Sequence, residues 1–260
     1  MATKLVYLVT GSNRTNGIGY SLVSKLAERP NAVVFAGARD PNVQSLRDLA
    51  AKHSNVYPIK FLVNDRANND AAIADIKKIA GQLDVVVANA GIATLESYVP
   101  VAKAPIEFYQ EHLEVNMLGT IVLFQAAQEL LLASPTRAPI FAYISTGVAS
   151  LTKFMGPDVS IYGASKVAGN FIIKALDAEN PSLIAMAISP GWCATDMGND
   201  GAKRRGSTGR EEAPMKVEDV VEGVLNRIDG ATKEKSSGRF WNFKPTSGNP
   251  WDCEQEEYPW

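Results

Sequence analysis

Tyr162 and Lys166 form a pair that could carry acid–base chemistry. They stand four residues apart in SIYGASKVAGNFI, which has the pattern of a helix, so their side chains share one helix face. A tyrosine hydroxyl with a pKa near ~10 exchanges protons poorly at neutral pH. A neighbouring ammonium favours the phenolate, so we expect Lys166 to lower the pKa of Tyr162. Because such pairs are also common on helix surfaces, the rest of the chain must decide between the two interpretations.

A glycine-rich turn near the N-terminus could bind a phosphate. The segment TGSNRTNGIG follows a run of strand-forming residues and precedes a helix-like stretch, and it contains Gly11, Gly17 and Gly19. Glycines there permit a tight turn and let a phosphate approach the backbone at a helix N-terminus. No Gly-Lys-Ser/Thr follows, so the turn is not a P-loop and we expect no ATP or GTP hydrolysis.

The elements that must position these residues alternate along the chain. Short apolar runs followed by longer amphipathic stretches predict an α/β fold, a doubly wound parallel sheet of the Rossmann type. The expected strands cover residues 5–10, 32–38, 56–63, 84–90, 139–145, 183–189 and 238–243. The expected helices cover residues 17–29, 41–53, 67–80, 105–133, 162–178 and 216–228. Residues 190–215 are predicted to form a mobile lid loop, and residues 1–260 a single domain.

Composition excludes several other classes of protein. The net charge of −2 predicts neither nucleic acid nor a membrane surface as a partner. Cys193 and Cys253 lie far apart and outside any Cys-x-x-Cys, so we expect a reduced, cytoplasmic protein. The two histidines, His53 and His112, lack metal-ligand spacing, so no metal is expected. A Gly-x-Ser-x-Gly elbow is missing, which argues against a hydrolase.

Six segments in order resemble the short-chain dehydrogenase/reductase family. They are TGSNRTNGIG, ANAG (88–91), EVNMLGT (114–120), YIST (143–146), YGASK (162–166) and SPGWCATDM (189–197). The resemblance implies hydride transfer between a nicotinamide cofactor and a carbonyl or alcohol. It implies that Tyr162 is the acid–base residue and that Lys166 lowers the pKa of Tyr162 and holds the nicotinamide ribose. It also implies that Asn116 holds a water in a proton relay. The cofactor-binding residues that we expect are Gly11, Asn13, Arg14, Gly17, Ile18, Gly19, Arg39, Val63, Asp65, Asn89, Gly91, Tyr162, Lys166, Pro190, Gly191, Cys193 and Thr195.

The cofactor region departs from the family pattern at two places. The turn has five residues between its first two glycines where the family has three, so Thr15 and Asn16 look like an insertion. The family often has an aspartate at the end of the third strand that meets the adenine. Leu62 aligns with it here, Asp65 is nearby, and Val63 can contribute only packing and backbone.

The residue that polarises the substrate carbonyl also departs from the family pattern. The usual serine aligns with Thr146, which retains a hydroxyl donor, and Ser145 and Ser150 are the alternatives.

The end of the second expected strand indicates the cofactor. An acidic residue there binds the free ribose of NAD, whereas an arginine accommodates the 2′-phosphate of NADP. AVVFAGARDP places Arg39 before Asp40, and Arg14 in the glycine turn can reach the same phosphate. Asp40 can instead cap the next helix. We therefore expect NADP(H), with carbonyl reduction as the working direction.

The substrate is expected to be a small carbonyl or alcohol compound with a bulky, apolar or aromatic body. Three segments offer apolar walls for it, with the residues Leu95, Tyr98, Phe154, Met155, Trp192 and Met197. Within the family the chain resembles the fungal norsolorinic-acid-ketoreductase-like group and the small carbonyl reductases, which implies a ketone of secondary metabolism. The alternative is an NADP-binding redox sensor or a non-redox cyclisation catalyst on the same fold.

A homodimer or homotetramer is a further expectation. The expected helix at 105–133 carries apolar residues such as Leu118, Val122 and Leu123, which could form a face between subunits or be covered within one chain.

Overall fold

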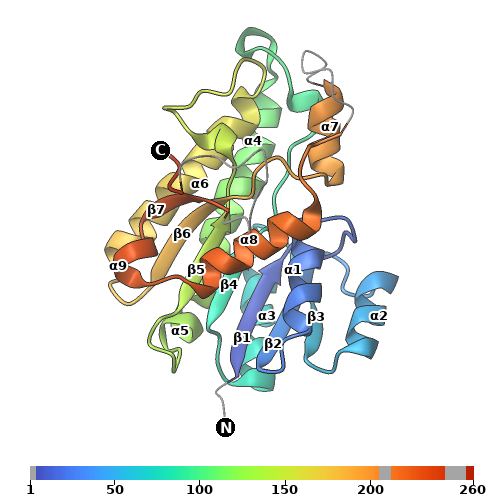
Figure 1. The fold of residues 1–260 in the computed structure, drawn as a ribbon, viewed down its shortest axis with the longest axis vertical. Helices are drawn as coiled ribbons and strands as arrows, with labels where there is room; N and C mark the ends of the chain where they lie inside the picture. The colour runs from blue at the N-terminus through green and yellow to red at the C-terminus, as the bar shows by residue number, and fades with distance from the viewer. Residues whose placement is uncertain (1–3, 205–211, 244–255) are drawn as a thin grey trace.

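The core of the protein is a seven-stranded parallel sheet with the strand order β3-β2-β1-β4-β5-β6-β7. The computed structural model describes residues 4–204, 212–243 and 256–260 (Figure 1). The order reverses between β1 and β4, which creates a switch point where such sheets bind ligands. The strands are β1 (Leu5–Thr10), β2 (Ala32–Ala38), β3 (Val56–Lys60), β4 (Val85–Ala88), β5 (Ile140–Ile144), β6 (Ile184–Ser189) and β7 (Arg239–Asn242).

Helices cover both faces of the sheet, so the inner strands are buried on two sides, whereas the edge strands β3 and β7 keep exposed and half-buried residues. In β1, Tyr7 and Val9 pack in one apolar cluster while Val6 and Leu8 pack in the other, as the period of two in a strand requires. The first cluster includes residues of α1 (Ile18–Ala27), α2 (Gln44–Lys52) and α8 (Val217–Asp229). The second includes residues of α3 (Arg66–Ala80), α5 (Gly119–Leu132) and α6 (Ser160–Glu179). The predicted doubly wound parallel sheet is therefore confirmed.

The third strand ends earlier than the sequence predicts. It stops at Lys60 rather than at residue 63, because the chain leaves the sheet there to begin α3. The backbone N–H of Leu62 donates to the Asn68 side chain at 2.6 Å, and Asn64 has a positive φ of 59°. This local turn replaces strand pairing at the positions that carry Leu62 and Val63.

The segment predicted as a lid loop contains a helix, so that part of the prediction is wrong. Helix α7 (Asp196–Arg204) lies beyond the ends of the strands, at the upper end of Figure 1. The Thr195 hydroxyl accepts from the N–H of Gly198 at 3.1 Å, and the Trp192 indole donates to the Gly198 carbonyl at 3.0 Å. Ala202 is fully buried. These tertiary contacts outweigh the low helix propensity of a Gly- and Asp-rich sequence. Residues 205–211 of the predicted lid lie outside the described residues, as does Cys253.

The long helix predicted at 105–133 is helical from residue 106 to 132 but is not uniform. It consists of α4 (Ile106–Leu113), a π-helical turn at Glu114–Leu118 and α5. Within the described residues, it is the one helical stretch long and apolar enough to cross a membrane by length and composition, and here its α5 part packs on β4 and α3. Of the apolar residues considered for a subunit interface, Leu123 is buried in the core while Leu118 is exposed. The interface itself stays a prediction.

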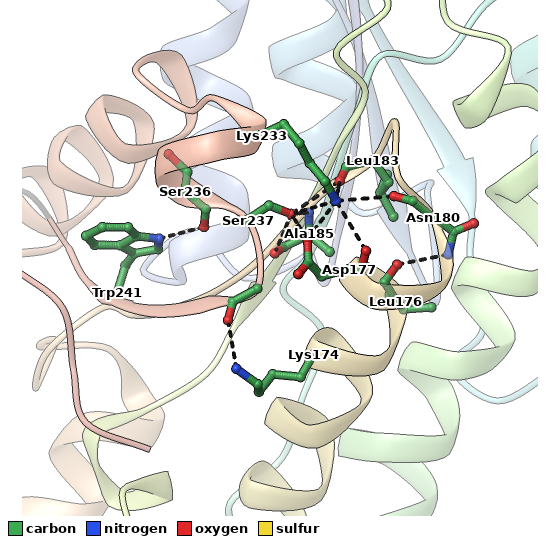
Figure 2. Close-up of polar contacts among 11 residues, drawn as sticks. Lys174, Leu176, Asp177, Asn180, Leu183, Ala185, Lys233, Ser236, Ser237 and Trp241 are labelled. Carbon is green, nitrogen blue, oxygen red and sulfur yellow. Dashed lines mark hydrogen bonds and ion pairs between the residues drawn. The ribbon is translucent and has the colours of Figure 1, made fainter.

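Lys233 makes hydrogen bonds that link the C-terminal end of α6 to the segments that precede β6 and β7. This residue opens the short helix α9 (Lys233–Ser236), and its amine donates to the Asp177 carboxylate at 2.6 Å and to the Leu183 carbonyl at 2.8 Å (Figure 2). The Ser237 hydroxyl donates to the same carboxylate oxygen of Asp177. Burial alone would raise the pKa of Asp177, but the hydrogen bonds from Lys233 and Ser237 prevail and lower it. This cluster positions the start of β7 on the sheet.

Candidate active site

A cavity of about 630 Å³ lies at the carboxyl ends of the strands. Residues that directly follow β1, β3, β4, β5 and β6 line it, together with residues at the ends of β2 and β7. The carboxyl ends of parallel strands meet at one edge of a sheet, which explains how segments far apart in the sequence share one cavity.

Tyr162 and Thr146 meet inside this cavity. Tyr162 lies in the first turn of α6, and Thr146 follows β5 at the start of a short 3₁₀ turn. A side-chain hydrogen bond joins the two hydroxyl groups, and both residues line the cavity. Two hydroxyls so joined can hold one carbonyl oxygen between them.

Lys166 lies one helical turn beyond Tyr162 and is almost fully buried. Its amine donates to the Ile144 carbonyl at 2.8 Å and lies 4.6 Å from the centre of the Tyr143 ring. Burial lowers the pKa of Lys166 to about 7. Lys166 is therefore held in the cavity wall by the carbonyl at the end of β5 and by the face of the Tyr143 ring.

The pKa of Tyr162 moves in the direction opposite to the one that the sequence predicts. Burial raises it, Tyr98 raises it further, and only the hydrogen bond with Thr146 lowers it. The reason is that Tyr162 is itself buried, and burial disfavours its charged phenolate form. Tyr162 consequently keeps its proton at neutral pH.

The glycine-rich turn forms a bare wall of the cavity. A Cβ atom on Gly19 would lie 2.5 Å from both the Gly11 carbonyl oxygen and the Asn89 amide nitrogen, so no side chain fits there. The Asn89 amide donates to the Thr10 carbonyl at 2.9 Å, which fixes the β4 end against the turn. Gly17 begins α1 as its N-cap without a side-chain cap. The N–H groups at the start of this helix are therefore open to an anion.

Two arginines line the same cavity. Arg14 lies in the glycine turn and Arg39 directly follows β2. Among the residues that the structure describes, no ion pair involves either of them. The Asp40 carboxylate accepts from the N–H of Asn42 at 2.9 Å, as an Asx turn does. Both guanidinium groups are thus available to a phosphate.

Asn116 lies behind the cavity wall rather than in it. It occupies the π-helical turn, and its side-chain oxygen accepts from the Ile92 N–H at 2.9 Å. Its amide nitrogen donates to the Ile92 carbonyl and to the Ser165 hydroxyl, each at 2.9 Å. Gly91 packs against Asn116 and against the Lys166 amine. Asn116 therefore links the loop after β4 to α6 by hydrogen bonds. The water-mediated proton relay stays a prediction.

The alternatives to Thr146 are engaged elsewhere. The Ser145 hydroxyl donates to the Asn170 side chain at 2.6 Å, although the residue borders the cavity. The Ser150 hydroxyl donates to the Pro259 carbonyl at 2.7 Å, and Ser150 is not among the cavity residues. Asp65 is also outside the cavity, because its carboxylate caps α3 by accepting from the Asn68 N–H at 3.0 Å.

The other expected cofactor residues line the cavity. These are Gly11, Asn13, Gly17, Ile18, Gly19, Val63, Asn89, Gly91, Pro190, Gly191, Cys193 and Thr195. Cys193 forms a backbone bridge with Met215, and burial raises the pKa of its thiol to about 12, so it is an unreactive wall residue.

Four of the six expected substrate residues also line the cavity, namely Tyr98, Met155, Trp192 and Met197. Leu95 and Phe154 are exposed and do not. Sequence reasoning missed Met215, Phe243 and Tyr258, which border the cavity from the far end of the chain. Nothing in the sequence indicated where the C-terminal segment packs.

Comparisons with known proteins agree with this architecture. The family model of the short chain dehydrogenase matches residues 5–206. A norsolorinic acid ketoreductase of Dothistroma septosporum is 35% identical over 257 residues, which cover 95% of this chain and 93% of that protein. The norsolorinic acid ketoreductase of Aspergillus parasiticus is 36% identical over 256 residues, covering 95% and 91%.

Among solved structures, the NADPH-bound carbonyl reductase from chicken fatty liver superposes with a TM-score of 0.81. It is 25% identical to this chain, and the match covers 95% of both chains. The chain therefore belongs to the short chain dehydrogenase family and is an oxidoreductase with a Rossmann-type fold.

Proposed function

We propose that the protein is an NADPH-dependent ketoreductase that reduces a bulky, apolar or aromatic ketone, with Tyr162 as the proton donor. The observation that carries this proposal is the hydrogen bond between Tyr162 and Thr146 inside the cavity, with Lys166 buried in the same wall. The curated relatives named norsolorinic acid ketoreductase support a ketone of secondary metabolism as the substrate class.

The cavity fits a dinucleotide cofactor. The bare wall at Gly19 and the open N-terminus of α1 suit a pyrophosphate, which approaches backbone N–H groups closely. Arg39 and Arg14 suit the 2′-phosphate that distinguishes NADP(H) from NAD(H). The NADPH-bound neighbour supports the same cofactor. When bound, NADPH supplies the hydride.

The residues of this chain supply the remaining chemistry. Thr146 donates a hydrogen bond to the substrate carbonyl, which stabilises the negative charge that develops on its oxygen. Tyr162 then delivers the hydroxyl proton to this oxygen. Because burial raises the pKa of Tyr162, the proton is present at neutral pH when reduction begins. Lys166, with a pKa of about 7, supplies positive charge next to the phenolate that this transfer leaves.

Asn116 acts as a positioning residue in this account. It holds the Ile92 backbone on one side and the Ser165 hydroxyl on the other. The distance between the cavity wall after β4 and the helix that carries Tyr162 is thereby fixed, as a reaction with tight geometric demands requires.

A panel of aromatic and alicyclic ketones tests the proposal, with NADPH or NADH as reductant and the loss of nicotinamide absorbance as the signal. Steady oxidation of NADPH with an aromatic ketone is the expected result, with a lower kcat/KM for NADH. NADPH binding without turnover on any ketone would contradict the proposal and favour a redox sensor.

A further inference from the structure

The tail segment, residues 256–260, packs beside the active site although it stands nearly a hundred residues after Tyr162 in the sequence. It lies along the last strand of the sheet. The N–H of Tyr258 donates to the Phe240 carbonyl at 2.7 Å, and Trp241 and Glu257 form an antiparallel bridge. The rings of Tyr258 and Phe240 lie 5.1 Å apart. The tail segment thus extends the sheet beyond β7.

The tail segment also holds the chain that follows Thr146. The Ser150 hydroxyl donates to the Pro259 carbonyl at 2.7 Å, and the Thr152 hydroxyl donates to the Trp260 main-chain oxygen at 2.9 Å. The Lys153 amine lies 5.4 Å from the centre of the Tyr258 ring. These contacts fix the Tyr258 ring between the sheet and the loop that begins at Thr146.

Tyr258 is the part of the tail segment that enters the cavity. Its hydroxyl lies so close to Gly147, the residue after Thr146, that a Cβ on Gly147 would be 2.6 Å from it. Met155 borders the same place, with its sulfur 3.4 Å from that Cβ position. The width of the cavity next to the catalytic hydroxyl is therefore set by a tyrosine ring and by a residue without a side chain.

We propose that Tyr258 is a specificity-determining residue that admits flat aryl ketones and disfavours ketones that are bulky in three dimensions. A rigid ring held beside Thr146 leaves room for a planar group, whereas a bicyclic aliphatic ketone needs the volume that the ring fills. This inference rests on the proposed ketoreductase function and names the substrate class for it.

The test compares kcat/KM for 2-acetylnaphthalene, a flat aryl ketone, with kcat/KM for camphor, a bicyclic aliphatic ketone. The wild type should prefer 2-acetylnaphthalene. Tyr258→Ala should shift the ratio toward camphor by about tenfold or more, the discrimination that pocket walls achieve. Tyr258→Phe should leave the preference in place, because it keeps the ring. Tyr258→Leu removes the ring with less loss of apolar packing, and it replaces Tyr258→Ala if that variant does not fold.

Gly147→Ala tests the close contact between Gly147 and the Tyr258 hydroxyl. Its Cβ should displace the Tyr258 ring and lower kcat/KM for 2-acetylnaphthalene about tenfold, as overpacking does. In the Tyr258→Ala background the same substitution should change kcat/KM by no more than about twofold, since the colliding group is gone. Glu257→Gln is the matched control in the tail segment, because the Glu257 carboxylate pairs with Arg239 and does not border the cavity.

The outcomes distinguish a failure of this inference from a failure of the proposed function. A wild type that reduces ketones but shows the same ratio as Tyr258→Ala overturns this inference alone. A Gly147→Ala loss that persists without the Tyr258 ring overturns it as well. A wild type that reduces no ketone overturns the proposed function and this inference with it. The NADPH dissociation constant, measured by fluorescence, should differ little between wild type and the Tyr258 variants, and a large loss would mean that the tail segment supports cofactor binding instead.

Discussion

Replacing Arg39 by alanine should weaken NADPH binding while leaving NADH binding almost unchanged. Arg39 lies at the end of β2, lines the cavity and has no ion-pair partner among the described residues, so its charge is available to the 2′-phosphate. A charge-assisted hydrogen bond is worth about 1.5–3 kcal/mol. Because Arg39 is solvent-exposed, we take the lower end of that range, and about 1.5 kcal/mol corresponds to roughly tenfold in affinity.

The assay is kcat/KM for both cofactors in the wild type and in Arg39→Ala. The loss should appear in KM for NADPH, with kcat changed little, because the phosphate is distant from the reacting bond and binds equally in ground and transition states. Arg14→Ala should act in the same sense but more weakly, since Arg14 lies in the enlarged turn. Arg47→Ala is the matched control, because that guanidinium on α2 donates to Gln44 and does not border the cavity. Equal losses for NADPH and NADH would refute the assignment of Arg39 to the phosphate.

Three further predictions follow from other parts of the molecule. Thr146→Ala should lower kcat by about a hundredfold or more, while Thr146→Ser should be mild, because one positioned hydroxyl donor is lost or kept. Steady-state kinetics checks this. Asn16→Ala should raise KM for NADPH, because the Asn16 amide donates to the Asp196 carboxylate and so connects the enlarged turn to α7 at the cavity wall. A variant with unchanged KM for NADPH and an unchanged NADPH dissociation rate would contradict that role. Lys233→Met should lower the free energy of unfolding at pH 7 by about 1–3 kcal/mol, because the amine's hydrogen bonds are lost. Since the pKa of Asp177 is lowered in the folded protein, its stabilisation is complete above about pH 4 and lost as the pH falls through the folded-state pKa, and the difference between wild type and Lys233→Met in denaturant titrations should shrink there.

The fold was predictable because its signals are local and repeated. Nearly continuous apolar runs marked six of the seven strands, and the strand ends brought Gly11, Asn89 and Thr146 to one edge of the sheet, as the carboxyl-end rule requires. The wrong predictions concern segments whose local structure is decided by tertiary contacts. Helix α7 forms in a Gly- and Asp-rich segment because Thr195 and Trp192 hold its first turn.

Residue types and spacing located the candidate site but not its electrostatics. The four-residue spacing placed Tyr162 and Lys166 on one face of α6, yet it could not show that both are desolvated, which reverses the expected pKa shift of Tyr162. Asp65 looked available to an adenine until the start of α3 at Arg66 made it a helix cap. Tyr258 could not be placed at all, because its position depends on pairing with a strand far from Thr146 in sequence.

The most direct test of the ketoreductase account is the single-turnover rate of Tyr162→Phe, measured with saturating NADPH and the best ketone of the panel. Only the phenolic hydroxyl changes, so the NADPH dissociation constant should stay close to that of the wild type. The rate should fall by about a hundredfold or more, as expected when a general acid is lost from the transition state. A Tyr162→Phe variant that reduces the ketone at nearly the wild-type rate would contradict the account.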